Sequence, residues 1–146
     1  MQTNSFLLYG ANGYTGELIA RYAHQYNLQA ILAGRRKEVI EPLADRLQLP
    51  YRIFDMSDEA ALLAALKEVN IVVNAAGPFQ FTAKQMIEAC LQTGTHYLDI
   101  NGDIAVFEML KRFDDAAKKA GIMLLPGAGF DVVPTDCIAL QLKKAL

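Results

Sequence analysis

Six short apolar runs separated by helical patterns constrain the fold of this chain more than any other feature. Runs such as FLLY and IVV are apolar at every position, which is typical of strands covered by helices on both faces of a parallel sheet. Parallel neighbours need crossover connections, and the segments between the runs supply helices for them. The runs cover residues 6–9, 30–33, 51–54, 71–73, 96–100 and 122–125. The sequence therefore predicts an α/β domain with a doubly wound parallel sheet of about six strands.

The segments between the runs carry start and stop residues of helices. We expect Thr82 to cap a helix that ends at Gly94. We expect Ser57 to cap the helix that contains Leu62 and Leu66. A later helix is expected to stop at Gly121. Pro42 falls within another helical stretch, where it would remove a hydrogen bond, so that helix is expected to begin near Pro42 or to bend there.

The composition favours one soluble domain with a small-molecule ligand. The 146 residues have a formal charge of -2, and Lys and Arg are scattered, which argues against nucleic acid or an acidic membrane as partner. No apolar run approaches the roughly 18 residues needed to cross a bilayer, and the N-terminus lacks the pattern of a signal peptide. Cys90 and Cys137 show no metal-ligand spacing and are typical of reduced, buried cytosolic thiols. These features predict a cytoplasmic protein without a metal site.

Three glycines follow the first apolar run directly and precede a helical pattern. A dinucleotide-binding turn needs glycine where the backbone turns, where it approaches pyrophosphate and where the helix packs on the sheet, which suits Gly10, Gly13 and Gly16. The amides of Gly13, Tyr14 and Thr15 would lie free at the positive end of the helix. The spacing G-x-x-G-x-x-G differs from the best-known fingerprint, and a plain turn would also use glycine. The position after the first strand favours a phosphate-binding turn of the Rossmann type.

The end of the second run indicates which dinucleotide binds. An NAD site commonly carries Asp or Glu about 20 residues beyond the turn, whereas a 2′-phosphate favours arginine. This chain has Arg35 and Arg36 there, and the first acidic residue after the second run is Glu38. A guanidinium group forms charge-assisted, often bidentate hydrogen bonds with phosphate. The sequence therefore favours NADP over NAD, although two arginines at a strand end can also be simply solvated.

Two later strand ends are expected to face the same crevice. Asp55 could accept a hydrogen bond from the adenine amino group, or it could only cap the next helix. Small residues follow the fourth run, where they would let an adenosine or nicotinamide ribose lie against the backbone, or would only form a tight loop. These residues are Asn74, Ala75, Ala76, Gly77 and Pro78.

Five segments together resemble the saccharopine dehydrogenase-like oxidoreductases, including the branch of trans-acting enoyl reductases. They are GANGYTG, LAGRR, VVNAAGPF, THYLDINGD and GAGFDVVPTD, and the resemblance spans nearly the whole chain. It implies an NAD(P)-binding Rossmann domain with GANGYTG, which includes Asn12, at the pyrophosphate. It also implies that Arg35 and Arg36 lie near the 2′-phosphate and that AAGPF lies beside the ribose and the nicotinamide.

Members of this family are longer and continue into a second α/β domain. The resemblance therefore implies that residues 1–130 form the dinucleotide-binding domain and that residues 131–146 begin the connection to a missing substrate or catalytic domain. The final helical segment is unusually apolar, which is typical of an interface and raises the prospect of a homo-oligomer. Its apolar residues are Val132, Val133, Ile138, Leu140 and Leu142. On this hypothesis the chain binds cofactor but reduces nothing alone.

The sequence thus favours an oxidoreductase that transfers hydride between NADP(H) and a small organic substrate. Its catalytic residues are not identified, because several polar residues are expected near the carboxyl ends of the last two strands. These are His96, Tyr97, Asp99, Asp103, Asp131 and Asp136. One alternative is a non-enzymatic redox sensor that responds to NADP. A complete small reductase of the short-chain type is disfavoured, because no Tyr-x-x-x-Lys pair is present.

Overall fold

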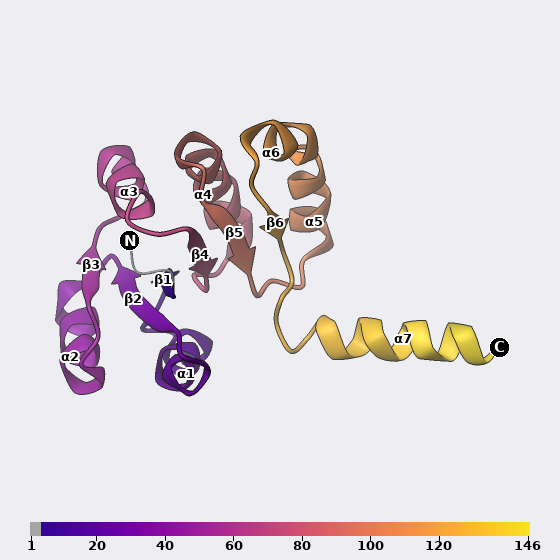
Figure 1. Ribbon diagram of the computed structural model, residues 1–146, viewed down its shortest axis with the longest axis horizontal. Helices are drawn as coiled ribbons and strands as arrows, with labels where there is room; N and C mark the ends of the chain where they lie inside the picture. Colours follow the sequence, from indigo (N-terminus) through magenta and orange to yellow (C-terminus); the bar gives the residue numbers. More distant parts are fainter. Residues whose placement is uncertain (1–3) are drawn as a thin grey trace.

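The six predicted strands form one parallel sheet in the computed structural model, which describes residues 4–146 (Figure 1). The sheet order is β3-β2-β1-β4-β5-β6, and every neighbouring pair is parallel. The strands are β1 (Ser5–Tyr9), β2 (Gln29–Gly34), β3 (Tyr51–Ile53), β4 (Ile71–Asn74), β5 (His96–Asp99) and β6 (Leu124–Leu125). The predicted α/β class and doubly wound sheet are confirmed.

Helices cover the two faces of the sheet unequally (Figure 1). On one face, α1 (Tyr14–Tyr22), the short 3-10 helix η1 (Ala23–Tyr26) and α2 (Lys37–Leu47) lie over β1, β2 and β3. The helices on the other face are α3 (Glu59–Leu66), α4 (Phe79–Thr93), α5 (Ile104–Lys111) and α6 (Asp114–Ala120). The strand order therefore reverses between β1 and β4. In open α/β sheets, ligands bind at such a point.

Alternation along β1 divides the core into two clusters. Leu7 and Leu8 are both completely buried, but their side chains point to opposite faces, as in any strand. Leu7 belongs to the cluster that contains Met86 of α4, whereas Leu8 belongs to the cluster with Ala20 of α1 and Leu43 of α2. The run FLLY is apolar at each position because both faces of its strand are covered.

Helix α2 runs uninterrupted from Lys37 to Leu47 and contains Pro42, so the predicted start near Pro42 is wrong. Proline inside a helix costs about 3 kcal/mol. Burial of a large apolar side chain stabilises by roughly 1.5–3 kcal/mol, and α2 buries Ile40 and Leu43 together with Ala44. Packing of this face outweighs the missing hydrogen bond.

Two predicted caps are also wrong, although the predicted ends are confirmed. Asp58, not Ser57, caps α3 by accepting a hydrogen bond from the amide of Ala61. Helix α4 begins at Phe79, so Thr82 lies inside its first turn. The ends of α4 and α6 lie at the predicted glycines, which have φ values of 72° at Gly94 and 67° at Gly121.

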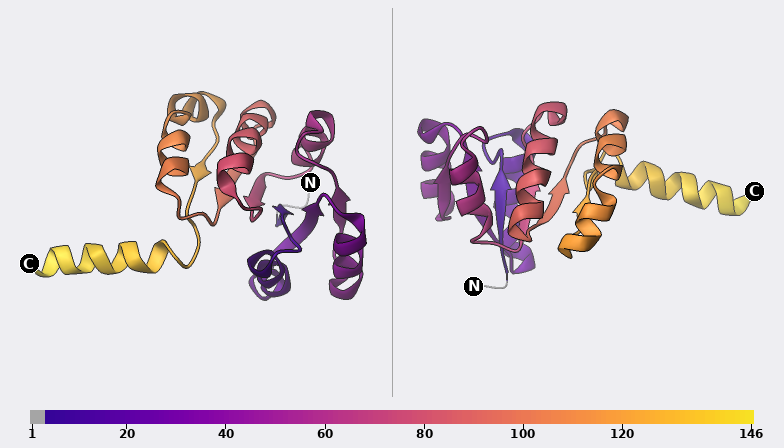
Figure 2. Two further views of the ribbon diagram at one scale, coloured as in Figure 1. Left: turned by 180° about the vertical axis from the view of Figure 1, so that it is seen from behind. Right: turned by 90° about the horizontal axis from the view of Figure 1, so that it is seen from above.

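The last helix, α7 (Val133–Ala145), has no buried residue and extends away from the sheet (Figure 2). The apolar side chains Ile138, Leu140 and Leu142 are all exposed. An apolar hollow of about 300 Å³ lies over β1, β4 and β5, on the face opposite α4, and Ala128 lines it shortly before α7 begins. Within residues 4–146, no helix combines the length and apolarity that a membrane span needs.

The two cysteines are expected to differ sharply in reactivity. Cys90 is completely buried in α4, and burial raises the pKa of its thiol to about 12. Cys137 is exposed on α7, so the predicted burial is wrong for this residue. Because only the thiolate reacts, one thiol per native chain should be labelled rapidly by a maleimide at neutral pH, and both in urea. Mass spectrometry should locate the rapid label on Cys137, and Cys137→Ser should abolish it. Rapid native labelling of Cys90 would contradict this burial.

Candidate functional site

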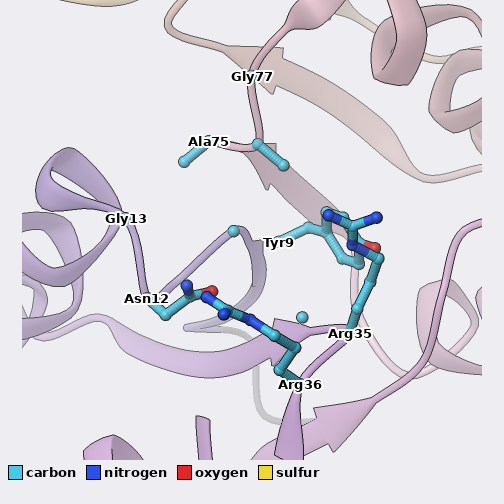
Figure 3. Close-up of a pocket in the computed structure, with 10 residues that line it drawn as sticks. Tyr9, Asn12, Gly13, Arg35, Arg36, Ala75 and Gly77 are labelled. Atoms are coloured by element: carbon cyan, nitrogen blue, oxygen red, sulfur yellow. The ribbon is translucent and has the colours of Figure 1, made fainter. Parts of the chain in front are cut away.

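A cleft of about 260 Å³ opens at the carboxyl ends of β1, β2 and β4, where the strand order changes direction (Figure 3). Its wall consists of glycines and alanines, two arginines, Tyr9 and Asn12. The lining residues are Tyr9, Gly10, Asn12, Gly13, Gly34, Arg35, Arg36, Ala75, Ala76 and Gly77. The sequence missed Tyr9 and Gly34, although each is the last residue of its strand and therefore had to lie at this edge.

Five other predicted site residues lie outside this wall. Tyr14, Thr15 and Gly16 belong to the first turn of α1, and Pro78 is the N-cap residue of α4. Asp55 follows β3. The cleft thus brings together the glycine turn, the arginine pair and the loop after β4, while the first turn of α1 lies beside it.

The three glycines of the turn have different structural roles. Gly10 has a φ of +84°, and a Cβ there would lie 2.7 Å from the amide nitrogen of Ala76. A Cβ at Gly16 would lie 2.3 Å from the carbonyl oxygen of Gly10, so the close packing of α1 on the turn requires glycine. Gly13 has an ordinary φ of -76°, and its nearest neighbour would be 3.3 Å from a Cβ. The fold explains the glycines at 10 and 16 better than the one at 13.

One of the three predicted free amides is not free. The amide of Gly13 donates to the carbonyl oxygen of Gly10 at 3.0 Å, which closes the turn. The amides of Tyr14 and Thr15 belong to the first turn of α1, and helical geometry gives such amides no acceptor within the helix. The role of these two amides as anion donors at the positive end of α1 stays a prediction.

Alanine at Gly16 is expected to lower the free energy of unfolding by roughly 3 kcal/mol, because the added Cβ forces backbone atoms apart. Urea unfolding followed by circular dichroism measures this loss. Gly102→Ala is the matched control, since its Cβ would find only Val132 Cγ2, at 3.8 Å. Equal stability of the Gly16→Ala and Gly102→Ala proteins would contradict the packing of α1 on this turn.

The arginine pair lies on the connection between β2 and α2 and lines the cleft. Figure 3 shows the side chain of Arg36 reaching toward Asn12 and that of Arg35 lying beside Tyr9. Arg35 Nε is 3.8 Å from Asp55 Oδ2, and the side chain of Arg35 is 72% exposed. Among residues 4–146, Arg36 forms no ion pair. Two positive groups, one of them not paired with a carboxylate, therefore stand at the β2 end of the cleft.

Asp55 lies next to Arg35, in the turn between β3 and α3. Its Oδ1 accepts hydrogen bonds from the amide of Ser57 at 2.9 Å and from the hydroxyl of Ser57 at 2.8 Å. These two hydrogen bonds lower the pKa of Asp55 from its usual value, and the one from the Ser57 amide has the larger effect. Contact of Asp55 with adenine stays a prediction.

Four of the polar residues considered for catalysis have other roles in the fold. His96 begins β5, at the edge of the sheet opposite the cleft, and its Nδ1 accepts the amide of Met123 at 2.9 Å. Asp103 caps α5. Tyr97 and Asp99 are completely buried, and Tyr97 donates its hydroxyl to Asp99 Oδ2 at 2.7 Å. None of these side chains lines the cleft.

The buried Asp99 carboxylate instead joins β5 to the two loops beside it. Its Oδ1 accepts hydrogen bonds from the amide of Asn101 at 3.1 Å, the side chain of Asn101 at 2.6 Å and the amide of Gly127 at 2.8 Å. Burial and the nearby Asp99 raise the pKa of Tyr97 far above its usual value, so its hydroxyl stays protonated. Asp131 and Asp136 lie exposed at the start of α7.

A parallel sheet with a glycine turn after β1, an arginine pair after β2 and a cleft where the strand order reverses defines a dinucleotide-binding domain of the Rossmann class. The family profile "Saccharopine dehydrogenase NADP binding domain" matches residues 6–125, and the chain belongs to this family. The predicted family is thus confirmed, and so is NADP as the cofactor of the domain.

Relatives share about a quarter of the aligned residues. A mouse saccharopine dehydrogenase-like oxidoreductase is 27% identical over 160 aligned residues, which cover 96% of this chain and 37% of that protein. A trans-acting enoyl reductase of Mycobacterium bovis is 28% identical and is covered over 35% of its length. A Caenorhabditis elegans relative, 27% identical and covered over 37%, is named a lipid droplet localized protein, so the cytoplasmic location stays a prediction. The chain spans little more than a third of these relatives.

Solved structures confirm the fold at lower identity. Saccharopine dehydrogenase (L-Glu forming) from Saccharomyces cerevisiae superposes with a TM-score of 0.74 at 21% identity, over 88% of this chain and 28% of the yeast chain. The structure of AtPrR2 with NADP+ and (+)pinoresinol gives a TM-score of 0.61 at 18% identity, over 84% of this chain and 48% of that chain.

Proposed function

We propose that this chain is the cofactor domain of an oxidoreductase that transfers hydride between NADP(H) and a small organic substrate. The observation that carries the proposal is a cleft with the glycine turn in its middle and Arg35 and Arg36 at its β2 end. In this assignment the two guanidinium groups bind the 2′-phosphate by charge-assisted hydrogen bonds. NADP supplies the hydride chemistry when bound, and this chain supplies binding and orientation.

The glycine turn suits the pyrophosphate because it combines donors with open space. The amides of Tyr14 and Thr15 lie at the positive end of α1, where an anion is favoured. Asn12 adds a side-chain amide to the cleft wall. The space beside Gly13, which a side chain would fill, suits close approach of a phosphate to the backbone. We assign the loop of Ala75, Ala76, Gly77 and Pro78 to the ribose rings and keep Asp55 as a candidate for adenine.

The substrate side is assigned to a domain beyond this chain. We propose that residues 1–130 form the cofactor domain and that 131–146 begin the connection, since α7 leaves the sheet and exposes Ile138 and Leu142. The greater length of the relatives supports this division. The same exposed residues favour self-association of the isolated chain.

The purified 146-residue chain is expected to bind NADPH and to reduce no substrate. Hydride transfer needs a substrate held close to the nicotinamide, and the polar residues of β5 are buried or distant from the cleft. Calorimetric titration measures binding, and loss of NADPH absorbance measures turnover with ketones, imines and enoyl compounds. Robust turnover would contradict the missing domain and favour a complete small reductase. If a natural chain with the further domain binds NADPH but reduces none of these substrates, the redox sensor becomes the better assignment.

A further inference from the structure

A closed ring of hydrogen bonds holds one residue of the cleft wall by both of its peptide groups. The amide of Ala76 donates to Asn74 Oδ1 at 3.1 Å, and Asn74 Nδ2 donates to Thr82 Oγ1 at 3.1 Å. The hydroxyl of Thr82 donates in turn to the carbonyl oxygen of Ala76 at 2.7 Å. The second hydrogen of Asn74 Nδ2 is donated to the hydroxyl oxygen of Tyr97 at 3.5 Å, so the buried amide of Asn74 has a partner for each of its donors.

Ala76 occupies a position on which the width of the cleft depends. Its amide nitrogen lies only 2.7 Å from the point where a Cβ of Gly10 would be, so the loop after β4 packs directly on the glycine turn. The preceding residue, Ala75, is fixed by its amide, which donates to the carbonyl oxygen of Tyr9 at 2.8 Å. Beyond Ala75 the backbone hydrogen bonds between β1 and β4 have ended, and the side chains of Asn74 and Thr82 hold the backbone of Ala76 instead.

Helix capping does not account for this ring. Helix α4 begins at Phe79 after Pro78, and Thr82 points its hydroxyl out of the helix to Ala76. Asn74 is completely buried, at a strand position where an apolar residue would avoid the cost of desolvating an amide. A buried amide is tolerated when it is fully hydrogen-bonded, and it then specifies one arrangement of its partners. Here that arrangement is the position of Ala76.

We propose that Asn74 and Thr82 are positioning residues of the NADP site, which hold Ala76 at a fixed distance from the glycine turn before the cofactor binds. The inference rests on the cofactor site proposed above. A loop that is already ordered loses less conformational entropy on binding, and this raises affinity without a direct contact. The ring shapes a part of the cleft that we assign to groups common to NADP and NAD, since the distinguishing 2′-phosphate is assigned to the arginine pair.

The test compares Thr82→Val, which removes the hydroxyl at nearly constant shape, with Thr82→Ser, which keeps it. Thr82→Val should weaken binding of NADPH and of NADH by the same factor, about 3- to 10-fold, and Thr82→Ser should stay within about 2-fold of the wild type. Thr93→Val is the matched control, because the Thr93 hydroxyl donates to the carbonyl oxygen of Ala89 at the far end of the same helix. Amide hydrogen exchange at Ala76 should be faster in Thr82→Val only.

The outcomes separate the ring from the cofactor site itself. Wild-type affinities in Thr82→Val would overturn the positioning role, and so would an equal loss in Thr93→Val, which would indicate general destabilisation. A loss confined to NADPH would also overturn it, because the ring does not face the 2′-phosphate. A wild-type chain that binds neither cofactor would overturn the proposed function and the inference with it. If Thr82→Val does not fold, the same measurements on Thr82→Ala decide whether the ring has the positioning role.

Discussion

Replacement of both Arg35 and Arg36 by alanine is expected to weaken NADPH binding about 100-fold and to leave NADH binding nearly unchanged. Only NADPH carries the 2′-phosphate with which the two guanidinium groups would pair. The wild type should accordingly bind NADPH more tightly than NADH, because no carboxylate among residues 4–146 lines the β2 end of the cleft to repel the phosphate. Calorimetric titration of both cofactors measures the effect as a ratio of dissociation constants.

The two arginines are expected to contribute unequally. Arg35 already lies 3.8 Å from a carboxylate oxygen of Asp55, whereas Arg36 forms no ion pair among residues 4–146. Arg36→Ala should therefore cost more NADPH affinity than Arg35→Ala. Replacement of Arg21 and Arg112, exposed arginines outside the cleft, is the control for net charge. Equal losses for both cofactors, or tighter binding of NADH by the wild type, would refute the assignment.

Valine at Gly13 is expected to abolish binding of both cofactors, with a loss of at least about 100-fold, while the domain stays folded. The side chain would occupy the space assigned to pyrophosphate. The fold itself tolerates the change, because Gly13 has an ordinary φ and its Cβ would meet only the carbonyl oxygen of Gly10, at 3.3 Å. We expect a loss of about 1 kcal/mol in the free energy of unfolding, since valine is a poor N-cap residue.

Binding and stability must be measured on the same Gly13→Val preparation. Titration with NADPH gives the first, and urea unfolding without cofactor gives the second. Gly13→Ala should show an intermediate loss of affinity, and Gly102→Val, outside the cleft, should bind as the wild type does. Normal NADPH binding by folded Gly13→Val would place the phosphate site elsewhere.

Local patterns were sufficient to predict the strands and the principal parts of the cleft. The run FLLY had to be buried on both faces, and the glycines after it had to form the turn into a helix. Strands that run parallel end at the same edge, so Arg35 and the loop of Ala75 and Ala76 were predicted to lie near that turn. These predictions needed only the residue order and the geometry of parallel strands.

Predictions that depended on which side chain meets which backbone group were less accurate. Thr82 was expected to cap α4, but its hydroxyl meets the carbonyl oxygen of Ala76 instead. Tyr97 and Asp99 were candidates for chemistry because they are polar and close to a strand end, and the structure buries both. The side chain of a polar residue near a strand end can face the cleft or the core, and the sequence pattern does not distinguish these two orientations.

The sequence by itself determined the class of fold, the order of its elements, the glycine turn after β1 and the arginine pair after β2, because each follows from local apolar pattern and backbone sterics. The tertiary structure decided which glycine the fold requires and which stands beside open space, as at Gly16 and Gly13. It also decided that Pro42 lies within α2 and that Asn74 and Thr82 hold Ala76. These outcomes depend on distances between segments far apart in the chain, which form only when the helices pack on the sheet.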